Sequence, residues 1–276
     1  MNRIKIMING MPGNVASSLA IHAMKDERFE IINASLTGPE IIQDRHIVAG
    51  KTFSLIHPDQ RDQAIVQIKN REKDFIAVDF THPTAVNGNA EFYCRNDLYF
   101  VMGTTGGDRQ KIEQTVLESG ISAVIAPNMA KQIVGFQAMM QYAADNFPGL
   151  FSGYRLEIRE SHQKGKADTS GTARAMVAYF NKMGVAFSED QIIRERDPRI
   201  QKSVWKIPEA YLSGHAWHTY TLNSEDETVA FSFTHNINGR DVYAQGTFDA
   251  VEFLFQKTKS NQKGRVYTMI DVLKQA

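Results

Sequence analysis

The chain has 276 residues, of which 42% are hydrophobic and 22% are charged, and its 31 basic residues balance 31 acidic ones. This length suffices for two domains, and the charge balance gives no electrostatic basis for nucleic-acid binding. The single cysteine, Cys94, excludes an internal disulfide and a thiolate cluster for a structural metal. No signal-peptide pattern opens the sequence and no apolar run approaches the ~20 residues of a membrane span, so we expect a cytoplasmic protein.

Short apolar runs alternate with helical stretches through the first half of the chain. We expect strands at Ile4–Ile8, Phe29–Leu36, Phe75–Phe80, Leu98–Met102 and Ile121–Ile125. This βαβ series predicts an α/β fold with a Rossmann-like, doubly wound parallel sheet. Ligands of such sheets bind beyond the carboxyl ends of the strands, so the loops at those ends are candidate binding segments.

The loop after the first predicted strand has the glycines of a dinucleotide-binding turn. Gly10 permits a tight turn, and Gly13 lets the backbone approach a pyrophosphate. Asn14 and Val15 then begin a helix whose N-terminus favours phosphate. The glycine spacing departs from G-x-G-x-x-G, and a plain turn is the alternative interpretation.

The second predicted strand ends without the acidic residue that binds the adenosine ribose of NAD. Ser35 and Thr37 are neutral, so nothing at these positions would repel a 2′-phosphate. We therefore expect NADPH to be the cofactor, with NADH possible because no arginine follows immediately. Small and hydroxylated residues follow the later strands, and we expect them to line the cofactor: Phe80, Gly103, Thr104, Thr105, Ala126, Pro127, Asn128 and Met129.

The segment Glu160–Thr172 concentrates polar side chains between a predicted strand and a predicted helix. His162 and Lys166 precede Ser170, Gly171 and Thr172, whose backbone N–H groups open the helix. A helix N-terminus attracts a carboxylate or phosphate, which His162 and Lys166 would then flank. The alternative is that Ser170 or Thr172 only caps the helix and that the other two residues are solvated.

Other polar residues carry weaker predictions. We expect Cys94 to be a small core residue, and we expect His215 and His218 to point to opposite faces of a strand rather than to bind a metal. The cluster Arg194–Arg199 is interpreted as a solvated, charge-balanced loop without a function. Downstream, Ala250 to Leu254 predicts an amphipathic helix.

Several motifs together resemble the dihydrodipicolinate reductases of lysine biosynthesis, over nearly the whole chain. The motifs are Glu160-x-His-x-x-x-Lys-x-Asp168, Ser170-Gly-Thr-Ala173, Asp79-Phe-Thr81, Gly103-Thr-Thr105 and Tyr267-x-Met-x-Asp-Val-Leu273. Gln163 stands where the common bacterial pattern has a second histidine, so the chain is similar to the plant-type branch of the family.

The resemblance implies reduction by NAD(P)H of a cyclic dicarboxylate, formed from 4-hydroxy-tetrahydrodipicolinate by loss of water, to tetrahydrodipicolinate. His162 and Lys166 would be the catalytic residues, and which of them donates the proton is open. Gln163, Ser170, Gly171, Thr172 and Arg240 would bind the substrate.

The resemblance also implies two domains and a homo-oligomer, either a dimer or a tetramer. Residues 1–129 and 246–276 would form the dinucleotide-binding domain, and residues 130–245 an α+β domain for substrate binding and oligomerisation. Two alternatives are a different NAD(P)-dependent dehydrogenase acting on an amino-acid-derived substrate and a non-catalytic nucleotide-binding sensor. A phosphorylating semialdehyde dehydrogenase would need a catalytic cysteine, and the context of Cys94 does not fit that role.

Overall fold

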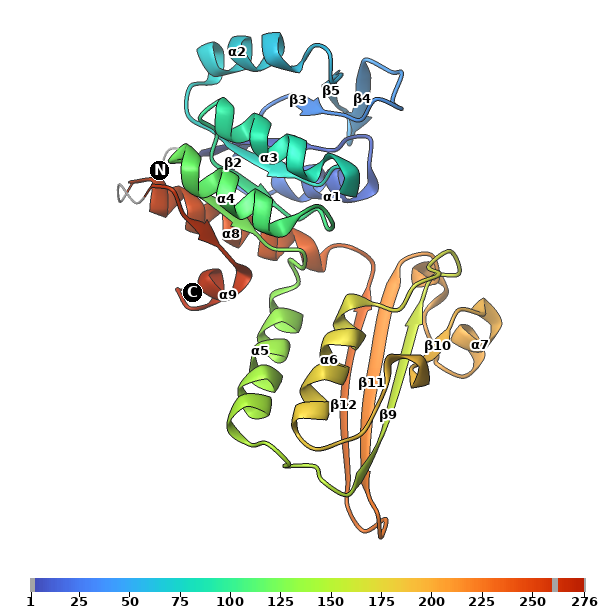
Figure 1. Ribbon diagram of the computed structural model, residues 1–276. Coiled ribbons are helices and arrows are strands. Elements are labelled where there is room, and N and C mark those ends of the chain that lie inside the picture. Colours follow the sequence, from blue (N-terminus) through green and yellow to red (C-terminus); the bar gives the residue numbers. More distant parts are fainter. Residues whose placement is uncertain (1–2, 260–262, 276) are drawn as a thin grey trace. The chain divides into compact units, whose positions relative to one another are not determined.

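The computed structural model describes residues 3–259 and 263–275 and divides into two compact units (Figure 1). Unit 1 comprises the described residues up to Lys131 together with those from Asp241 onward. Unit 2 comprises Gln132–Arg240. Across the described ranges, no helix is both long and apolar enough to cross a membrane.

Unit 1 contains a sheet of six parallel strands in the order β13-β8-β7-β6-β1-β2. Its strands are β1 Ile4–Asn9, β2 Phe29–Ile31, β6 Ile76–Asp79, β7 Phe100–Met102, β8 Ala123–Ile125 and β13 Val266–Tyr267. From β1 the chain continues to β2, which pairs with one edge of β1. The later strand β6 pairs with the opposite edge of β1. The predicted doubly wound sheet is therefore confirmed, and its topological switch point lies between β1 and β6.

Helices cover both faces of this sheet because successive strand residues point to opposite sides. The helices of unit 1 are α1 Asn14–Ala23, α2 Arg61–Glu72, α3 Val86–Arg95, α4 Arg109–Ser119, α8 Val242–Lys259 and α9 Met269–Leu273, with the short 3-10 turn η1 at Pro83–Ala85. Met7, Ala77 and Phe100 share one buried cluster with side chains of α2, α3 and α4. The alternate residues, such as Ile8 and Val78, are equally buried, and α8 contacts β6, β7 and β8.

Cys94 is a buried core residue of α3, as predicted.

The prediction of one strand over Phe29–Leu36 was wrong. The segment divides into β2 and β3 Ala34–Leu36, and β3 belongs to a separate three-stranded sheet in the order β3-β5-β4. The partners of β3 are β5 Lys51–Ile56, which is parallel to it, and β4 Arg45–Val48, which is antiparallel to β5. Both halves of the segment are apolar, so the pattern could not reveal that they pair with different neighbours.

Unit 2 is an α+β unit built on a mixed sheet in the order β10-β9-β11-β12. Its strands are β9 Tyr154–His162, β10 Ile193–Glu195, β11 His215–Ser224 and β12 Ala230–Asn238. Its helices are α5 Lys131–Asn146, which begins at the unit boundary, α6 Gly171–Lys182 and α7 Pro198–Ser203, with 3-10 turns η2 Glu189–Gln191 and η3 Glu209–Tyr211. Side chains of α5 and α6 share a buried cluster with Ile158, Tyr220 and Leu222 of the sheet, so these helices cover one sheet face.

Candidate active site

The segment from Glu160 to Thr172 is strand, loop and helix N-terminus, as its pattern predicted. The alternation of apolar and polar residues over Leu156–Glu160 predicts a shorter strand than is found, since β9 runs from Tyr154 to His162. His162 is therefore held at a strand end and is only 7% exposed, which excludes the alternative of a solvated loop residue. Lys166 lies in the loop between β9 and α6.

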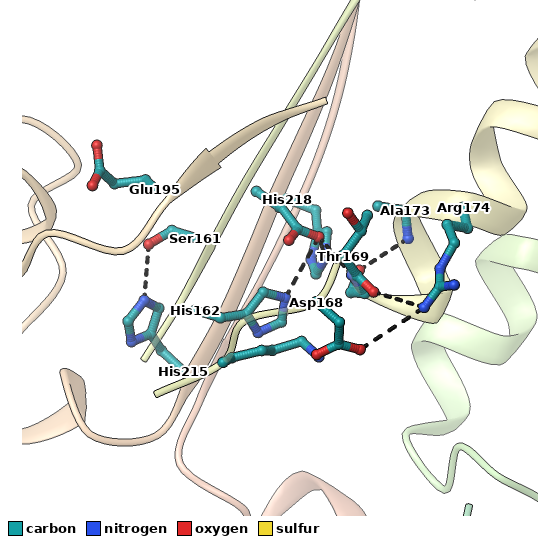
Figure 2. A network of polar contacts seen from close by, with 12 residues as sticks. Ser161, His162, Asp168, Thr169, Ala173, Arg174, Glu195, His215 and His218 are labelled. Atoms are coloured by element: carbon teal, nitrogen blue, oxygen red, sulfur yellow. Dashed lines mark hydrogen bonds and ion pairs between the residues drawn. The ribbon is translucent and has the colours of Figure 1, made fainter. Parts of the chain in front are cut away.

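Three polar side chains form a row across the sheet of unit 2. Glu160 of β9 pairs with His218 of β11, and His218 pairs with His235 of β12. Glu160 is fully buried and His218 is 2% exposed. The rings of His218 and His235 stack with their centroids 4.7 Å apart, and that of His162 meets His218 edge-on at 5.1 Å. The register therefore brings together one carboxylate and three imidazoles, of which His235 is half-buried and the other groups are buried. We call these four residues the histidine cluster; Figure 2 shows His162 beside His218.

Glu160 is charged despite its burial. Burial alone would raise its pKa, but hydrogen bonding by His218, Arg196 and Ser170 holds the pKa well below its ordinary value. Arg196 donates from Nη2 to Oε1 at 2.5 Å, and the backbone N–H of Ser170 donates to Oε2 at 3.1 Å. The cluster thus contains a fixed negative charge.

The imidazoles of His162 and His235 are neutral at pH 7. Burial is the largest cause and the nearby His218 is the next largest, and the pKa of each ring is lowered to about 3. The Nε2 atom of His162 lies 3.8 Å from Oε2 of Glu160, and Nε2 of His218 lies 3.6 Å from the same oxygen. Three buried ring nitrogens have no hydrogen-bond partner among the described residues: Nε2 of His162, Nδ1 of His218 and Nδ1 of His235. The cluster therefore has unused hydrogen-bonding capacity.

The loop between β9 and α6 carries a cation, Lys166, and leads into the N-terminus of α6. Lys166 donates to Asp168 at 2.7 Å, and this hydrogen bond lowers the pKa of the Asp168 carboxyl. Ser170 is the N-cap of α6, where its Oγ accepts from Ala173 N and lies 2.8 Å from His218 Nε2. The capping interpretation is therefore correct for the side chain of Ser170. Gly171, which is exposed, and Thr172, which is half-buried, are the first two residues of the helix.

Two further predicted substrate residues, Gln163 of the same loop and Arg240, also lie in unit 2. Gln163 is half-buried and directly follows β9. The guanidinium of Arg240, also half-buried, lies beside Gly214, where an added Cβ would be 3.4 Å from Nη1. Nε2 of His235 lies 3.2 Å from the hydroxyl of Tyr220.

His215 and His218 point to opposite faces of β11, as predicted. His215 Nε2 lies 2.9 Å from Ser161 Oγ (Figure 2). Its Nδ1 lies 3.0 Å from the backbone oxygen of Tyr211. Glu160, His162 and His218 do place possible metal ligands within 4.8 Å of one another. Both oxygens of Glu160 already accept hydrogen bonds, however, and the Arg196 guanidinium would repel a cation, so we assign no metal to them.

The interpretation of Arg194–Arg199 as a solvated loop was wrong. Arg194 belongs to β10, Arg199 belongs to α7, and the side chain of Arg196 between them is only 18% exposed. Besides Glu160, its guanidinium binds the backbone oxygen of Lys166 through Nε at 2.8 Å. It therefore fixes the loop that carries Lys166. Arg199 is solvated as predicted, since its side chain is 91% exposed and pairs with Asp197, but it lies in α7 and not in a loop. A charge-rich sequence contains no signal that distinguishes these two arginines, because the partner of Arg196 is 36 residues away.

A second candidate site lies wholly in unit 1, at the switch point of its sheet. A cavity of about 700 Å³ is bordered by the loops after β1 and β6 and by the segment after β3. Gly10, with φ +108°, packs so closely on the next loop that an added Cβ would lie 2.1 Å from the backbone oxygen of Phe80. Gly13 caps α1 without a side-chain hydrogen bond, which leaves the first N–H groups of the helix open to the cavity rim. A glycine-lined helix N-terminus at a switch point fits the pyrophosphate of a dinucleotide.

The predicted cofactor residues divide into two sets. Those that border the cavity are Gly10, Gly13, Asn14, Thr37 and Phe80. The remaining ones do not border it: Val15, Ser35, Gly103, Thr104, Thr105, Ala126, Pro127, Asn128 and Met129. Ser35 is fully buried, and its Oγ accepts from the backbone N–H of Met11 at 3.1 Å. Sequence reasoning missed Glu40 and Arg61, which both border the cavity.

The parallel sheet with its glycine turn, together with a second unit that carries a lysine and a histidine cluster, defines a two-unit oxidoreductase of the Rossmann type. Two family models match the chain, dihydrodipicolinate reductase, N-terminus, over residues 4–129 and dihydrodipicolinate reductase, C-terminus, over residues 133–273. The chain belongs to the dihydrodipicolinate reductase family.

Relatives from plants and archaea agree with this assignment. The chain is 44% identical to 4-hydroxy-tetrahydrodipicolinate reductase 1, chloroplastic, of Arabidopsis thaliana, over 99% of this chain and 79% of that protein. It is 43% identical to a probable chloroplastic 4-hydroxy-tetrahydrodipicolinate reductase 2 of Oryza sativa subsp. japonica, over 98% and 83%. Identity to the 4-hydroxy-tetrahydrodipicolinate reductase of Methanopyrus kandleri is 29%, over 98% and 96%.

Solved structures agree on the fold. A dipicolinate-bound dihydrodipicolinate reductase from Paenisporosarcina sp. TG-14 superposes with a TM-score of 0.66 at 19% identity, over 97% of this chain and 98% of that one. Aspartate semialdehyde dehydrogenase II from Vibrio cholerae also superposes, with a TM-score of 0.53 at 10% identity, over 93% and 99%. The fold alone therefore does not separate the reductase from the alternative dehydrogenase.

Proposed function

We propose that this protein reduces the dehydrated form of 4-hydroxy-tetrahydrodipicolinate to tetrahydrodipicolinate, with NAD(P)H as the hydride donor. The observation that carries the proposal is the strand-loop-helix segment of unit 2. It combines His162, Lys166 and the open N-terminus of α6 in a chain whose family is a reductase family.

The substrate is a dicarboxylate, and the segment supplies the groups that such a substrate needs. The ammonium of Lys166 and the N–H groups of Gly171 and Thr172 can each bind a carboxylate. Gln163 can donate further hydrogen bonds, and Arg240 adds a second cation in the same unit. Ser170 supports these residues as the N-cap of α6.

The reaction also needs a proton. When hydride adds to one end of a conjugated C=C–C=N system, negative charge develops at the other end and must be met by a proton or a cation. Lys166 carries a proton that it can give to this position or hold close to it. His162 is neutral at pH 7, because burial and His218 lower its pKa to about 3, so it first serves as a hydrogen-bonding and proton-accepting group. Either residue can make the final proton transfer.

We propose NADPH as the preferred cofactor. It would supply the hydride, and its pyrophosphate would lie against Gly10, Gly13 and the N-terminus of α1. Thr37 is neutral, and the guanidinium of Arg61 at the same cavity can pair with a 2′-phosphate. The carboxylate of Glu40 favours ribose hydroxyls instead, so the preference rests on the balance between Arg61 and Glu40.

The test is oxidation of NADPH or NADH, followed at 340 nm, with substrate generated in place from pyruvate and aspartate semialdehyde by the preceding synthase. Synthase-dependent oxidation supports the proposal, and the two rates rank the cofactors. Cofactor binding without oxidation, under conditions in which a known reductase of this family turns over, would contradict it and favour a nucleotide-binding sensor. Oxidation driven directly by another amino-acid-derived carbonyl compound would instead favour the alternative dehydrogenase.

The assembly state and location are further parts of the proposal. We propose a homo-oligomer, either a dimer or a tetramer, in which unit 2 makes the subunit contacts, and a cytoplasmic location. Light scattering coupled to size-exclusion chromatography distinguishes a dimer from a tetramer, and a monomeric mass at micromolar concentration would contradict the oligomer.

A further inference from the structure

Asp79, the last residue of β6, carries a carboxyl group that is completely buried. Its Oδ2 accepts hydrogen bonds from Tyr93 Oη at 2.7 Å and from Asn89 Nδ2 at 2.9 Å. Its Oδ1 accepts from the hydroxyls of Thr104, at 2.6 Å, and of Thr81, at 2.9 Å, and from the backbone N–H of Thr81 at 3.3 Å. These bonds replace the hydrogen bonds to water that the carboxyl loses on burial. We call Asp79 and its four donor residues the Asp79 network.

The Asp79 network joins three segments of unit 1. Thr81 lies in the loop after β6, Thr104 lies in the loop after β7, and the other two donor residues belong to α3. The two loops also contact each other directly, because the backbone N–H of Thr81 donates to Thr104 Oγ1 at 2.9 Å. The ring of Phe80 packs against Gly103, where an added Cβ would lie 2.3 Å from it. The carboxyl of Asp79 therefore holds both loops and α3 in one arrangement.

Tyr93 connects the network to the first strand of the sheet. Its hydroxyl accepts a hydrogen bond from Asn9 Nδ2 at 3.0 Å, and Asn9 Oδ1 accepts from the backbone N–H of Leu36 at 2.9 Å. Burial, followed by the charge of Asp79, raises the pKa of Tyr93, so this hydroxyl stays protonated and donates to the carboxyl. Asp79 is thus the acceptor in each of its hydrogen bonds within the network.

The network reaches the cofactor cavity through Thr81 and Asn89. Both residues border the cavity together with Phe80, whereas Asp79 and Thr104 do not. Thr81 Oγ1 also accepts a hydrogen bond from Asn89 Nδ2 at 2.9 Å, so the two bordering side chains are fixed to each other as well as to the carboxyl. Asp79 can therefore act on a bound ligand only through the residues that it holds.

The position of the network indicates which half of a dinucleotide it serves. A dinucleotide lies across the switch point of such a sheet, with one half on each side. The side that follows β1 and β3 carries the glycine turn and Thr37, which we have proposed for the pyrophosphate and the adenosine ribose. The side that begins with β6 and β7 is then left for the nicotinamide half, and Asp79 joins the loops of these two strands.

Resting on the proposed use of NADPH, we propose that Asp79 is a positioning residue that holds the loops after β6 and β7 in the shape that receives the nicotinamide half of the cofactor. The adenosine half is bound on the other side of the switch point and does not depend on this carboxyl. Binding of the two halves should therefore respond differently when the network is broken.

The test compares Thr104→Val with Thr104→Ser and with wild type. Valine keeps the size of threonine but removes the hydroxyl that donates to Asp79, whereas serine retains this hydroxyl. Isothermal titration calorimetry measures the Kd for NADPH and for 2′,5′-ADP, which is the adenosine half with its 2′-phosphate. We expect Thr104→Val to raise the Kd for NADPH about fivefold to tenfold and to leave that for 2′,5′-ADP unchanged. Thr104→Ser should bind both as wild type does.

Two results would overturn the proposal. An unchanged Kd for NADPH in Thr104→Val would show that the hydrogen bond to Asp79 does not shape the cavity. An equal rise for NADPH and 2′,5′-ADP would show a general loss of structure, which is a different role.

Asp79→Asn breaks the network more severely. The amide puts a donor N–H₂ where the carboxyl accepts hydrogen bonds, so we expect a rise of about tenfold or more in the Kd for NADPH, again without a change for 2′,5′-ADP. If this variant does not fold, the comparison of the two Thr104 variants still decides, because Thr104→Val removes only one hydroxyl. Wild-type affinity for NADPH in a folded Asp79→Asn variant would contradict the role of Asp79.

Thr247 provides the matched control. It is a completely buried threonine of α8, in the same unit, and its hydroxyl donates to the backbone oxygen of Tyr243 within its own helix. Thr247→Val should leave both Kd values as in wild type. A rise for NADPH alone, equal to that of Thr104→Val, would show that the loss of any buried threonine hydroxyl of unit 1 has this effect and would overturn the proposal.

These binding measurements need no substrate, so they are separate from the test of the reductase function. If Thr104→Val selectively weakens NADPH binding but wild type shows no synthase-dependent oxidation, the reductase function fails while the role of Asp79 stands. If wild type binds NADPH no more tightly than 2′,5′-ADP, the nicotinamide half adds nothing to binding and the role of Asp79 fails, whatever the protein catalyses.

Discussion

The guanidinium of Arg196 donates a 2.5 Å hydrogen bond from Nη2 to Oε1 of Glu160, whose side chain is completely buried. The same guanidinium binds the backbone oxygen of Lys166 through Nε. One side chain thus pairs with the carboxylate at the centre of the histidine cluster and fixes the loop that carries Lys166. The proposed catalytic role of this part of unit 2 and its stability therefore depend on the same side chain.

Removing Arg196 should destabilise unit 2. Arg196→Ala leaves a buried, unpaired carboxylate, and breaking such a pair typically costs about 3 kcal/mol or more in the free energy of unfolding. Urea unfolding can be followed by the fluorescence of Trp205 and Trp217, because both tryptophans of the chain lie in unit 2. Arg199→Ala is the control and should change stability by less than about 0.5 kcal/mol, because its pair is exposed. Equal effects of the two substitutions would exclude a special role for the Arg196 pair.

Replacing Lys166 should impair turnover but not cofactor binding. We expect Lys166→Ala to lower kcat by ~10²-fold or more, since it removes a proton carrier and a carboxylate partner. The Kd for NADPH, measured by fluorescence titration, should remain unchanged, because the cofactor cavity lies in unit 1. Lys164, an exposed residue of the same loop, is the control, and Lys164→Ala should retain wild-type kcat. Normal turnover by Lys166→Ala would remove this lysine from the mechanism.

Cofactor preference should respond in opposite directions to Arg61 and Glu40. Arg61→Ala should raise the Kd for NADPH by about 10-fold or more while changing that for NADH little, because a charge-assisted hydrogen bond to phosphate is lost. Glu40→Gln should favour NADPH, since it removes a negative charge from the same cavity. Isothermal titration calorimetry with both cofactors measures the two ratios. Parallel shifts for NADPH and NADH would mean that neither residue is near the 2′-phosphate.

The first glycine of the turn should tolerate no side chain. Gly10→Ala combines φ +108° with a Cβ only 2.1 Å from the backbone oxygen of Phe80, so we expect lower thermal stability and loss of NADPH binding. Gly88 is the control, because an added Cβ there meets nothing within 4 Å and the residue lies inside α3. Gly88→Ala should stabilise the protein by about 0.5–1 kcal/mol. Wild-type melting and binding by Gly10→Ala would disprove the close approach of the two loops.

Lowering the pH should destabilise unit 2 already at pH values at which exposed carboxylates are still ionised. Burial, with a smaller effect of His218, lowers the pKa of His235 from its usual 6.5 to about 3. The unfolded chain therefore binds a proton that the folded state does not, so stability is complete above pH 6.5 and is lost as the pH falls toward 3. Each such histidine contributes a slope of about 1.4 kcal/mol per pH unit in that window. His235→Gln should reduce the slope, measured by tryptophan fluorescence in urea between pH 7 and 4.5, by about one proton. An identical slope would show that His235 is protonated in the folded state.

Local pattern predicted several parts of this protein correctly. The βαβ series, the glycine turn after β1 and the strand, loop and helix around Lys166 all depend on residues close together in the chain. Strands, helices and turns of this kind can be predicted from nearby residues, because turn geometry, helix capping and the period of apolar residues are all local. The same patterns failed at Phe29–Leu36, where two adjacent apolar segments pair with different sheets.

The sequence by itself determined the family, through the resemblance of its motifs to a known one. It also determined the Rossmann-like sheet and the residue types of the candidate site, through the period of apolar residues and the spacing of motifs. Only the tertiary structure decided that Glu160, His218 and His235 form one row, since strand register joins residues that are 58 and 17 positions apart (218 − 160 and 235 − 218). It also decided that Arg196, and not Arg199, pairs with the buried carboxylate. Burial and partner choice arise when distant segments pack together, and it is these two factors that set the charges of the site.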